Sequence, residues 1–144
     1  MGDRGQIIVR HGEGPAVFLY SHWTGHRLPH QVQVALERGG LNRANDAPYL
    51  ARIIFSRLIR GDVDGETGFG ISSESCDWEH PAIVLDTFTQ TVHATERGDG
   101  GGLVLGHRAS MVDFASHGLR ALGLEARQGG WSTWEELRER QLAC

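Results

Sequence analysis

The sequence contains no lysine, so arginine supplies all 14 of its basic side chains. Against them stand 18 acidic residues, which give a formal net charge of −4. Domains that bind nucleic acid over a long surface usually carry a strong basic excess, so this charge argues against an extended nucleic-acid interface. A local basic pocket remains compatible with it, because guanidinium groups hold anions through paired hydrogen bonds.

Cysteine is scarce, and long apolar runs are missing. Cys76 and Cys144 lie far apart without a C-x-x-C pair, so we expect free, reduced thiols and neither a zinc knuckle nor a disulfide scaffold. No apolar run approaches the roughly 20 residues that span a bilayer, and residues 1–5 do not begin a signal peptide. We therefore expect a cytoplasmic protein without a membrane partner, folded as a single globular domain over residues 1–144.

Hydrophobic periodicity and turn residues predict an order of elements in which strands and helices do not alternate. We expect strands at 6–10, 16–20, 69–72, 81–86 and 91–95, with an edge strand or a packed linker at 103–105. Helices are expected at 29–39, from the N-cap Asp46 to Gly61, from the capping pair Ser110 and Asp113 to Gly123, and at 132–137. This order predicts an α+β fold: an antiparallel sheet of about five strands with helices packed mainly on one face.

The first candidate site is the loop at 21–27, with the sequence SHWTGHR. His22, His26 and His30 are spaced four residues apart, as metal ligands on one helix face can be. Gly25 and Pro29 interrupt such a helix, so we predict no metal site and no cofactor. A carboxylate or a third histidine from elsewhere in the chain would be needed to restore a metal site.

The same loop leads into a helix, where unpaired backbone N–H groups can hold an anion. Arg27 would clamp that anion and Trp23 would stack on a flat group of the ligand. Neither G-x-x-x-x-G-K-[ST] nor G-x-G-x-x-G is present, so the site would not be a standard phosphate loop. The alternative for these two residues is a core position for Trp23 and a solvated one for Arg27. The predicted ligand-binding residues are His22, Trp23, Thr24, Gly25, His26, Arg27, Cys76 and His80.

A second candidate centres on Cys76 and His80, which precede a predicted central strand. A thiol and an imidazole can form a nucleophile and its base, with Asp77 or Asp86 orienting the imidazole. The hypothesis requires the two side chains to lie together, which spacing alone does not establish.

Three segments carry a resemblance to other proteins: LYSHWTG at 19–25, YLARIIF at 49–55, and TGFGIS at 67–72 followed by His80-Pro81. They resemble a group of short uncharacterised bacterial and phage-borne proteins, over the first two-thirds of the chain. The resemblance implies no catalytic residue and no cofactor. By analogy with small phage proteins that act on host factors, it favours an interaction or ligand-sequestering role with a host protein as partner.

These observations lead to three functional hypotheses. The first is a binding domain that holds a small anionic, nucleotide-like ligand in a strand–loop–helix cradle at 21–27, with the loop at 76–80 opposite. The second is a hydrolase, either metal-assisted through His22 and His26 or thiol-based through Cys76 and His80. The third is a structural or interaction subunit, and the sequence leaves open whether the chain forms a homo-oligomer.

Overall fold

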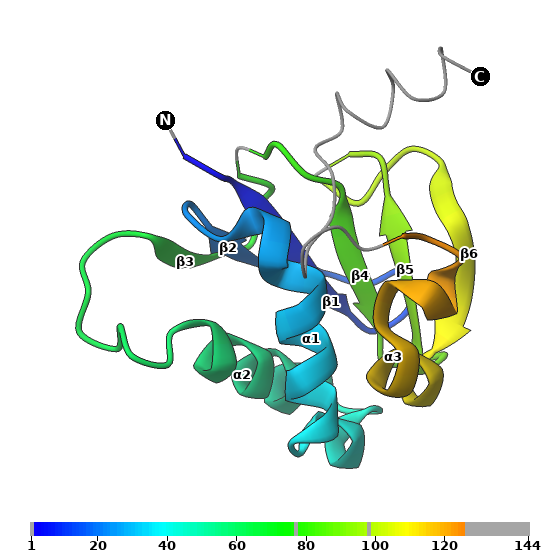
Figure 1. Ribbon diagram of the computed structural model, residues 1–144. Coiled ribbons are helices and arrows are strands. Elements are labelled where there is room, and N and C mark those ends of the chain that lie inside the picture. The colour runs from blue at the N-terminus through cyan, green and yellow to red at the C-terminus, as the bar shows by residue number, and fades with distance from the viewer. Residues whose placement is uncertain (1, 77, 98, 126–144) are drawn as a thin grey trace.

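The computed structural model describes residues 2–76, 78–97 and 99–125, and these residues form an α+β fold (Figure 1). The strands are β1 (Gly5–Arg10), β2 (Ala16–Ser21), β3 (Phe69–Ser72), β4 (Ala82–Asp86), β5 (Thr91–Thr95) and β6 (Val104–Ser110). The α-helices are α1 (Leu28–Glu37), α2 (Ala47–Leu58) and α3 (Met111–His117). Three short 3₁₀ helices accompany them, namely η1 (Gly25–Arg27), η2 (Gly40–Arg43) and η3 (Gly118–Leu122).

The predicted fold class is confirmed, but the predicted sheet is wrong in two respects. The described residues form six strands, in the order β3-β2-β1-β4-β5-β6, and the β1–β4 pair is parallel. All the other neighbouring pairs are antiparallel. The sixth strand was predicted only as an edge strand or linker at 103–105, because Gly106 and the polar residues after it interrupt the strand pattern. The parallel pair arises because α1, α2 and β3 intervene before the chain returns beside β1.

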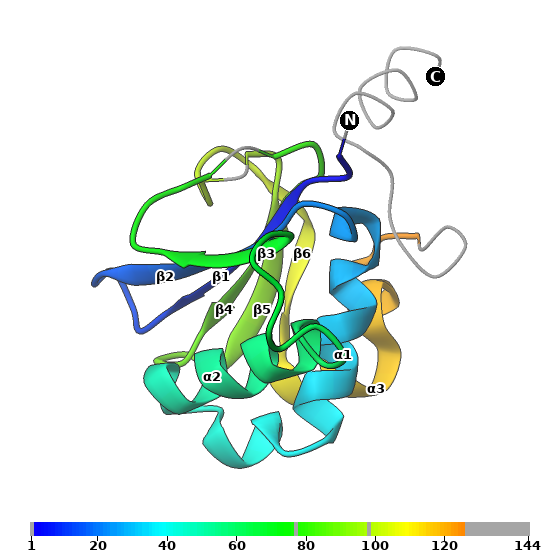
Figure 2. The same ribbon diagram turned by 90° about the vertical axis from the view of Figure 1, so that its left-hand side faces the viewer.

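The three α-helices of the described residues lie on one face of the sheet (Figure 2). Side chains that alternate along the strands meet them there, so that Ile7 and Val9 of β1 join a core with Leu36 of α1 and Ile54 of α2. On the other face, Ile8 packs in a smaller apolar cluster with Ala82 and Val84. That second face, called the open face below, carries the alternate residues of each strand.

The helix ends follow local signals that the sequence predicted. The side chain of Asp46 caps α2 by accepting a hydrogen bond from the backbone N–H of Tyr49, and Ser110 caps α3 in the same way through Asp113. Pro29 lies in the first turn of α1, as expected. The helix predicted at 132–137 lies outside the described residues. Within the described ranges, no helix combines the length and apolar character needed to cross a bilayer.

Candidate functional site

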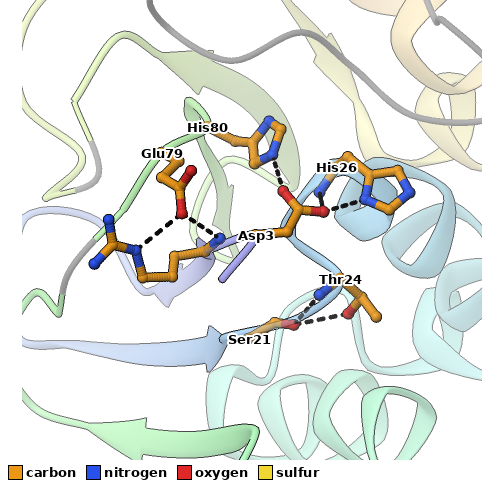
Figure 3. A network of polar contacts seen from close by, with 7 residues as sticks. Asp3, Ser21, Thr24, His26, Glu79 and His80 are labelled. Carbon is orange, nitrogen blue, oxygen red and sulfur yellow. Dashed lines mark hydrogen bonds and ion pairs between the residues drawn. The ribbon is translucent and has the colours of Figure 1, made fainter. Parts of the chain in front are cut away.

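A carboxylate from the N-terminal segment lies in the loop that was predicted to hold an anion. Asp3 Oδ2 accepts a hydrogen bond from the backbone N–H of His26 at 3.2 Å and a second one from His26 Nδ1. Its other oxygen, Oδ1, is hydrogen-bonded to His80 Nε2 (Figure 3). We call Asp3, His26 and His80 the Asp3 junction. At this junction Asp3, which was not among the predicted site residues, connects His26 and His80, which were.

Backbone contacts position Asp3 between the two loops. Its N–H donates to the carbonyl of His22 at 2.6 Å, and its own carbonyl accepts from the N–H of Gly25 at 2.7 Å. Gly25 permits this close approach, because a Cβ at that position would lie 2.7 Å from the carbonyl oxygen of Asp3 and from the carbonyl carbon of Arg4. The backbone of residues 3–5 passes so close to the start of η1 that position 25 requires a glycine.

The loop before β4 is tied to the same segment. The carbonyl of Arg4 accepts hydrogen bonds from the N–H groups of Glu79 at 2.8 Å and His80 at 3.3 Å. Arg4 also forms an ion pair with Glu79, with Nε 3.0 Å from Oε1. Residues 3–4 thus connect the loop at 21–27 with the loop at 79–80, as the dashed contacts in Figure 3 show.

The hydrogen bonds at the junction keep Asp3 ionised. Partial burial would raise the pKa of Asp3, but hydrogen bonds from the His26 and His80 side chains and from the His26 N–H outweigh it, so the pKa lies below its ordinary value of 3.8. The His80 side chain is only 3% exposed, whereas His26 is 45% exposed. Only His26 of this pair is open to a molecule from solvent.

The backbone donors of the predicted cradle are engaged within the chain. The N–H groups of Gly25 and His26 bond to Asp3, and the N–H of Arg27 donates to the carbonyl of Thr24 at 2.9 Å. Thr24 in turn bonds through its N–H and its hydroxyl to Ser21 Oγ, at 3.1 and 2.7 Å. An external anion at the start of η1 would have to displace the carboxylate of Asp3.

The aromatic residues of the loop lie at the surface. Trp23 is 55% exposed, so the core position considered for it is wrong. Its ring packs edge-on against His22, with the centroids 4.2 Å apart, and it passes close to Gly68. His22 Nδ1 is hydrogen-bonded to Tyr20 Oη at 2.6 Å. Arg27 is exposed, which agrees with the solvated position predicted as the alternative for this residue.

The geometry at Cys76 and His80 differs from that of a nucleophile and its base. In the part of the chain that the structure describes, Cys76 makes no hydrogen bond to His80, and its Sγ faces the carbonyl of Glu74 at 3.8 Å. The carboxylate that contacts His80 Nε2 is that of Asp3, whereas Asp86 lies at the opposite end of β4. Asp77 falls outside the described residues. Over residues 2–76, 78–97 and 99–125, no three potential ligand side chains are grouped to hold a metal ion.

A groove of about 780 Å³ lies on the open face of the sheet, and sequence reasoning did not find it. We call it the open-face groove. A usable signal was the alternation at 91–95, where Thr91 and His93 fall on the face opposite to Val92 and Ala94. The groove is lined by Arg10, Gly12, Glu13, Asp86, Phe88, Thr89, Thr91, His93, Gly100 and Arg108.

His93 is the unusual side chain of this groove. Its Nδ1 is buried and has no hydrogen-bond partner within the described part of the chain. Burial and, secondarily, the positive charge of Arg108 lower the pKa of His93 to about 4, although Asp86 acts in the opposite direction. The imidazole is therefore neutral near pH 7, and one of its ring nitrogens is unsatisfied.

The charged groups around His93 differ in how far they are already engaged. The Asp86 carboxylate accepts hydrogen bonds from the N–H groups of Gly12 and Phe88, each at 2.9 Å. Burial alone would raise the pKa of Asp86, but these backbone donors lower it below its ordinary value. Arg10 uses Nε to donate to the carbonyl of Gly12 at 2.5 Å. Arg108 is exposed, and its side chain makes no hydrogen bond or ion pair within the described ranges.

Comparison with known proteins identifies no relative. No family model, no curated protein and no solved structure matches the chain.

Proposed function

We propose that the protein binds a small anionic, nucleotide-like ligand, and that the open-face groove receives it in place of the loop at 21–27. The observation that carries the proposal is His93, a residue lining the groove whose buried Nδ1 has no hydrogen-bond partner among the described residues. A buried polar group without a partner costs about 1–3 kcal/mol, and a rotation of the ring that brings Nδ1 to a donor or acceptor of a ligand in the groove would recover that free energy. The loop is the weaker candidate because its backbone donors are engaged by Asp3 and Thr24.

The charges of the groove favour an anion near Arg108. Backbone N–H donors stabilise the Asp86 carboxylate, whereas the guanidinium groups of Arg10 and Arg108 keep N–H groups that no described residue occupies. Glu13 is exposed and would repel an anion on its side of the groove. We therefore expect the anionic end of the ligand beside Arg108.

An aromatic surface lies at the same groove. The ring of Phe88 is 66% exposed, and it is held in an edge-to-face contact with His11 at a centroid distance of 5.4 Å. Bases stack on such rings with about 1–3 kcal/mol each, which supports a ligand that carries a flat group. The groove volume of about 780 Å³ lies within the usual range of roughly 300–1,000 Å³ for small-molecule sites.

The proposal is tested by calorimetric titration of the protein with a panel of nucleoside mono- and diphosphates. We expect one or more of them to bind, and Arg108→Gln and Phe88→Ala each to weaken binding about tenfold or more. Arg43→Gln is the matched control, because Arg43 is an exposed arginine outside the groove that lies over the ring of Tyr49. Arg27→Ala and Trp23→Ala test the loop at 21–27 as the alternative binding site.

Two results would refute the proposal. One is the absence of binding by the whole panel. The other is binding that Arg27→Ala and Trp23→Ala abolish while Arg108→Gln leaves it unchanged, which would place the ligand at the loop at 21–27.

The Asp3 junction supports a second candidate function, hydrolysis with His26 as general base. Asp3 holds His26 Nδ1, and Nε2 of this half-exposed ring has no partner within the described residues. A carboxylate that orients one imidazole nitrogen and leaves the other free is the arrangement of a general base. Hydrolysis of a panel of esters and phosphodiesters, with His26→Ala as the comparison, tests it: activity that survives His26→Ala would exclude this role.

A further inference from the structure

A cleft of about 370 Å³ lies between α1 and α2 and is rich in arginine. We call it the arginine cleft. Its walls carry Arg38 at the end of α1 and Arg52, Arg57 and Arg60 on and just after α2. Its residues belong to α1, α2 and the turn after α2, and these helices lie on one face of the sheet (Figure 2), whereas the residues of the open-face groove lie on the other face.

In the part of the chain that the structure describes, the four guanidinium groups have no acidic partner. Within the described ranges none of them forms an ion pair, and the one hydrogen bond among them runs from Arg57 Nε to Gln31 Oε1 at 3.2 Å. That bond ties α2 to α1 and fixes one wall of the cleft. Four like charges gathered in one depression repel each other, and the chain as a whole carries a net charge of −4. The arrangement is therefore locally costly unless an anion joins it.

Helix dipoles explain only part of this clustering. Cations are favoured at helix C-termini, where Arg38 caps α1 and Arg57 lies in the last turn of α2. Arg52 lies in the middle of α2, where the dipole gives it no such advantage. Two apolar side chains also line the wall: Ala35 is 2% exposed, and Ile53 is partly buried against the core.

We infer that the arginine cleft binds a small molecule that carries at least two phosphoryl groups. A phosphoryl group has a charge of about −1.5 to −2, so two of them match the four positive charges that line the cleft. Planar guanidinium groups pair with phosphate oxygens through two parallel hydrogen bonds. The hydroxyl of Ser56, which also lines the cleft, is available as a further donor.

Inorganic diphosphate is the probe for this inference, with orthophosphate as the weaker comparison. By calorimetry we expect diphosphate to bind more tightly than orthophosphate, and added salt to weaken the binding. The double variant Arg52→Gln/Arg60→Gln should weaken diphosphate binding about 100-fold, or about tenfold for each guanidinium removed. Both positions are exposed, so the variant should fold, and Arg38→Gln provides an independent single change.

The matched control is Arg43→Gln/Arg120→Gln, which removes the same charge from two exposed positions outside the cleft. It should leave the diphosphate affinity within about twofold of the parent. No diphosphate binding, or equal weakening by the control, would overturn the inference. Binding that Arg108→Gln abolishes would also overturn it, by assigning the diphosphate to the open-face groove. The nucleotide titrations test the open-face groove with Arg108→Gln and Phe88→Ala, and the diphosphate titrations test the arginine cleft with Arg52→Gln/Arg60→Gln. Either proposal can therefore be refuted while the other stands.

Discussion

Removal of the Asp3 carboxylate should destabilise the whole protein, although the residue is only the third of the chain. Asp3→Ala removes three hydrogen bonds, one from the His26 N–H and two from the His26 and His80 rings. His80 is 3% exposed, and loss of the hydrogen bond between its Nε2 and Asp3 costs about 1–3 kcal/mol. His26 is 45% exposed, so water replaces its lost partner and the cost there is below about 1 kcal/mol.

Together these losses give an expected decrease of about 2–4 kcal/mol in the free energy of unfolding. Asp3→Asn should cost less, about 1 kcal/mol, because the amide oxygen still accepts from His26 while its NH₂ group can donate to His80 after a change of tautomer. Urea unfolding at pH 7, followed by circular dichroism, measures both values. Asp64→Ala, at an exposed turn position, is the control and should change the free energy by less than about 0.5 kcal/mol.

The pH dependence gives an independent check on the same carboxylate. The pKa of Asp3 in the folded protein lies below its ordinary value of 3.8, so the unfolded state takes up the proton first as the pH falls. The stabilisation by Asp3 is therefore complete well above pH 3.8 and is lost as the pH falls through the pKa of the folded state. The stability difference between the parent and Asp3→Asn should shrink over that interval. A parent and an Asp3→Ala variant of equal stability at pH 7 would refute this reasoning.

Three further predictions concern single positions. Gly25→Ala should destabilise the fold by more than about 2 kcal/mol, because its Cβ would lie within 2.7–2.8 Å of backbone atoms of residues 3–5. Gly14→Ala, whose nearest neighbour would be 3.5 Å away, is its control in the same urea experiment. The His93 ring signals in NMR spectra should stay constant from pH 8 to pH 5, because the pKa of His93 is about 4 in the folded protein. The pKa of His93 in the unfolded state is about 6.5, so His93 should lower the stability of the fold as the pH falls from about 6.5 to about 4. Asp46→Ala should cost about 1 kcal/mol through the lost helix cap, measurable by thermal unfolding.

Local features of the fold could be predicted from the sequence, and pairings between distant segments could not. Asp46 and Ser110 cap helices through side-chain hydrogen bonds to residues three positions ahead, so a stretch of a few residues is enough to predict their role. The parallel pair of β1 and β4 depends on how two helices return the chain, and no local pattern encodes that. β6 was predicted only as a short edge strand or linker at 103–105, because Gly106 and the polar residues after it do not follow the hydrophobic pattern of a strand.

The candidate site shows the same division. His26 and His80 were singled out from the sequence, and the structure brings them together, but Asp3 was missed because a residue next to the N-terminus carries no periodic signal. The sequence predicted an external anion at the start of the helix after the loop at 21–27, and this stays a prediction, because the Asp3 carboxylate accepts the hydrogen bond of the His26 N–H there. The sequence did not show that the chain supplies a negative charge there itself. The exposed Trp23 shows that the usual burial of tryptophan is a tendency that a single loop can override.

The proposed function is tested most directly at the unpartnered nitrogen of His93. The measurement is a titration of ¹⁵N-labelled protein with the nucleotide panel, in which the His93 ring nitrogens are followed by NMR. If the open-face groove is the binding site, the Nδ1 signal of His93 should shift and saturate with added nucleotide, and Arg108→Gln should weaken that response about tenfold. A His93 signal that stays unchanged at saturating nucleotide, in a protein that binds it, would contradict the proposal.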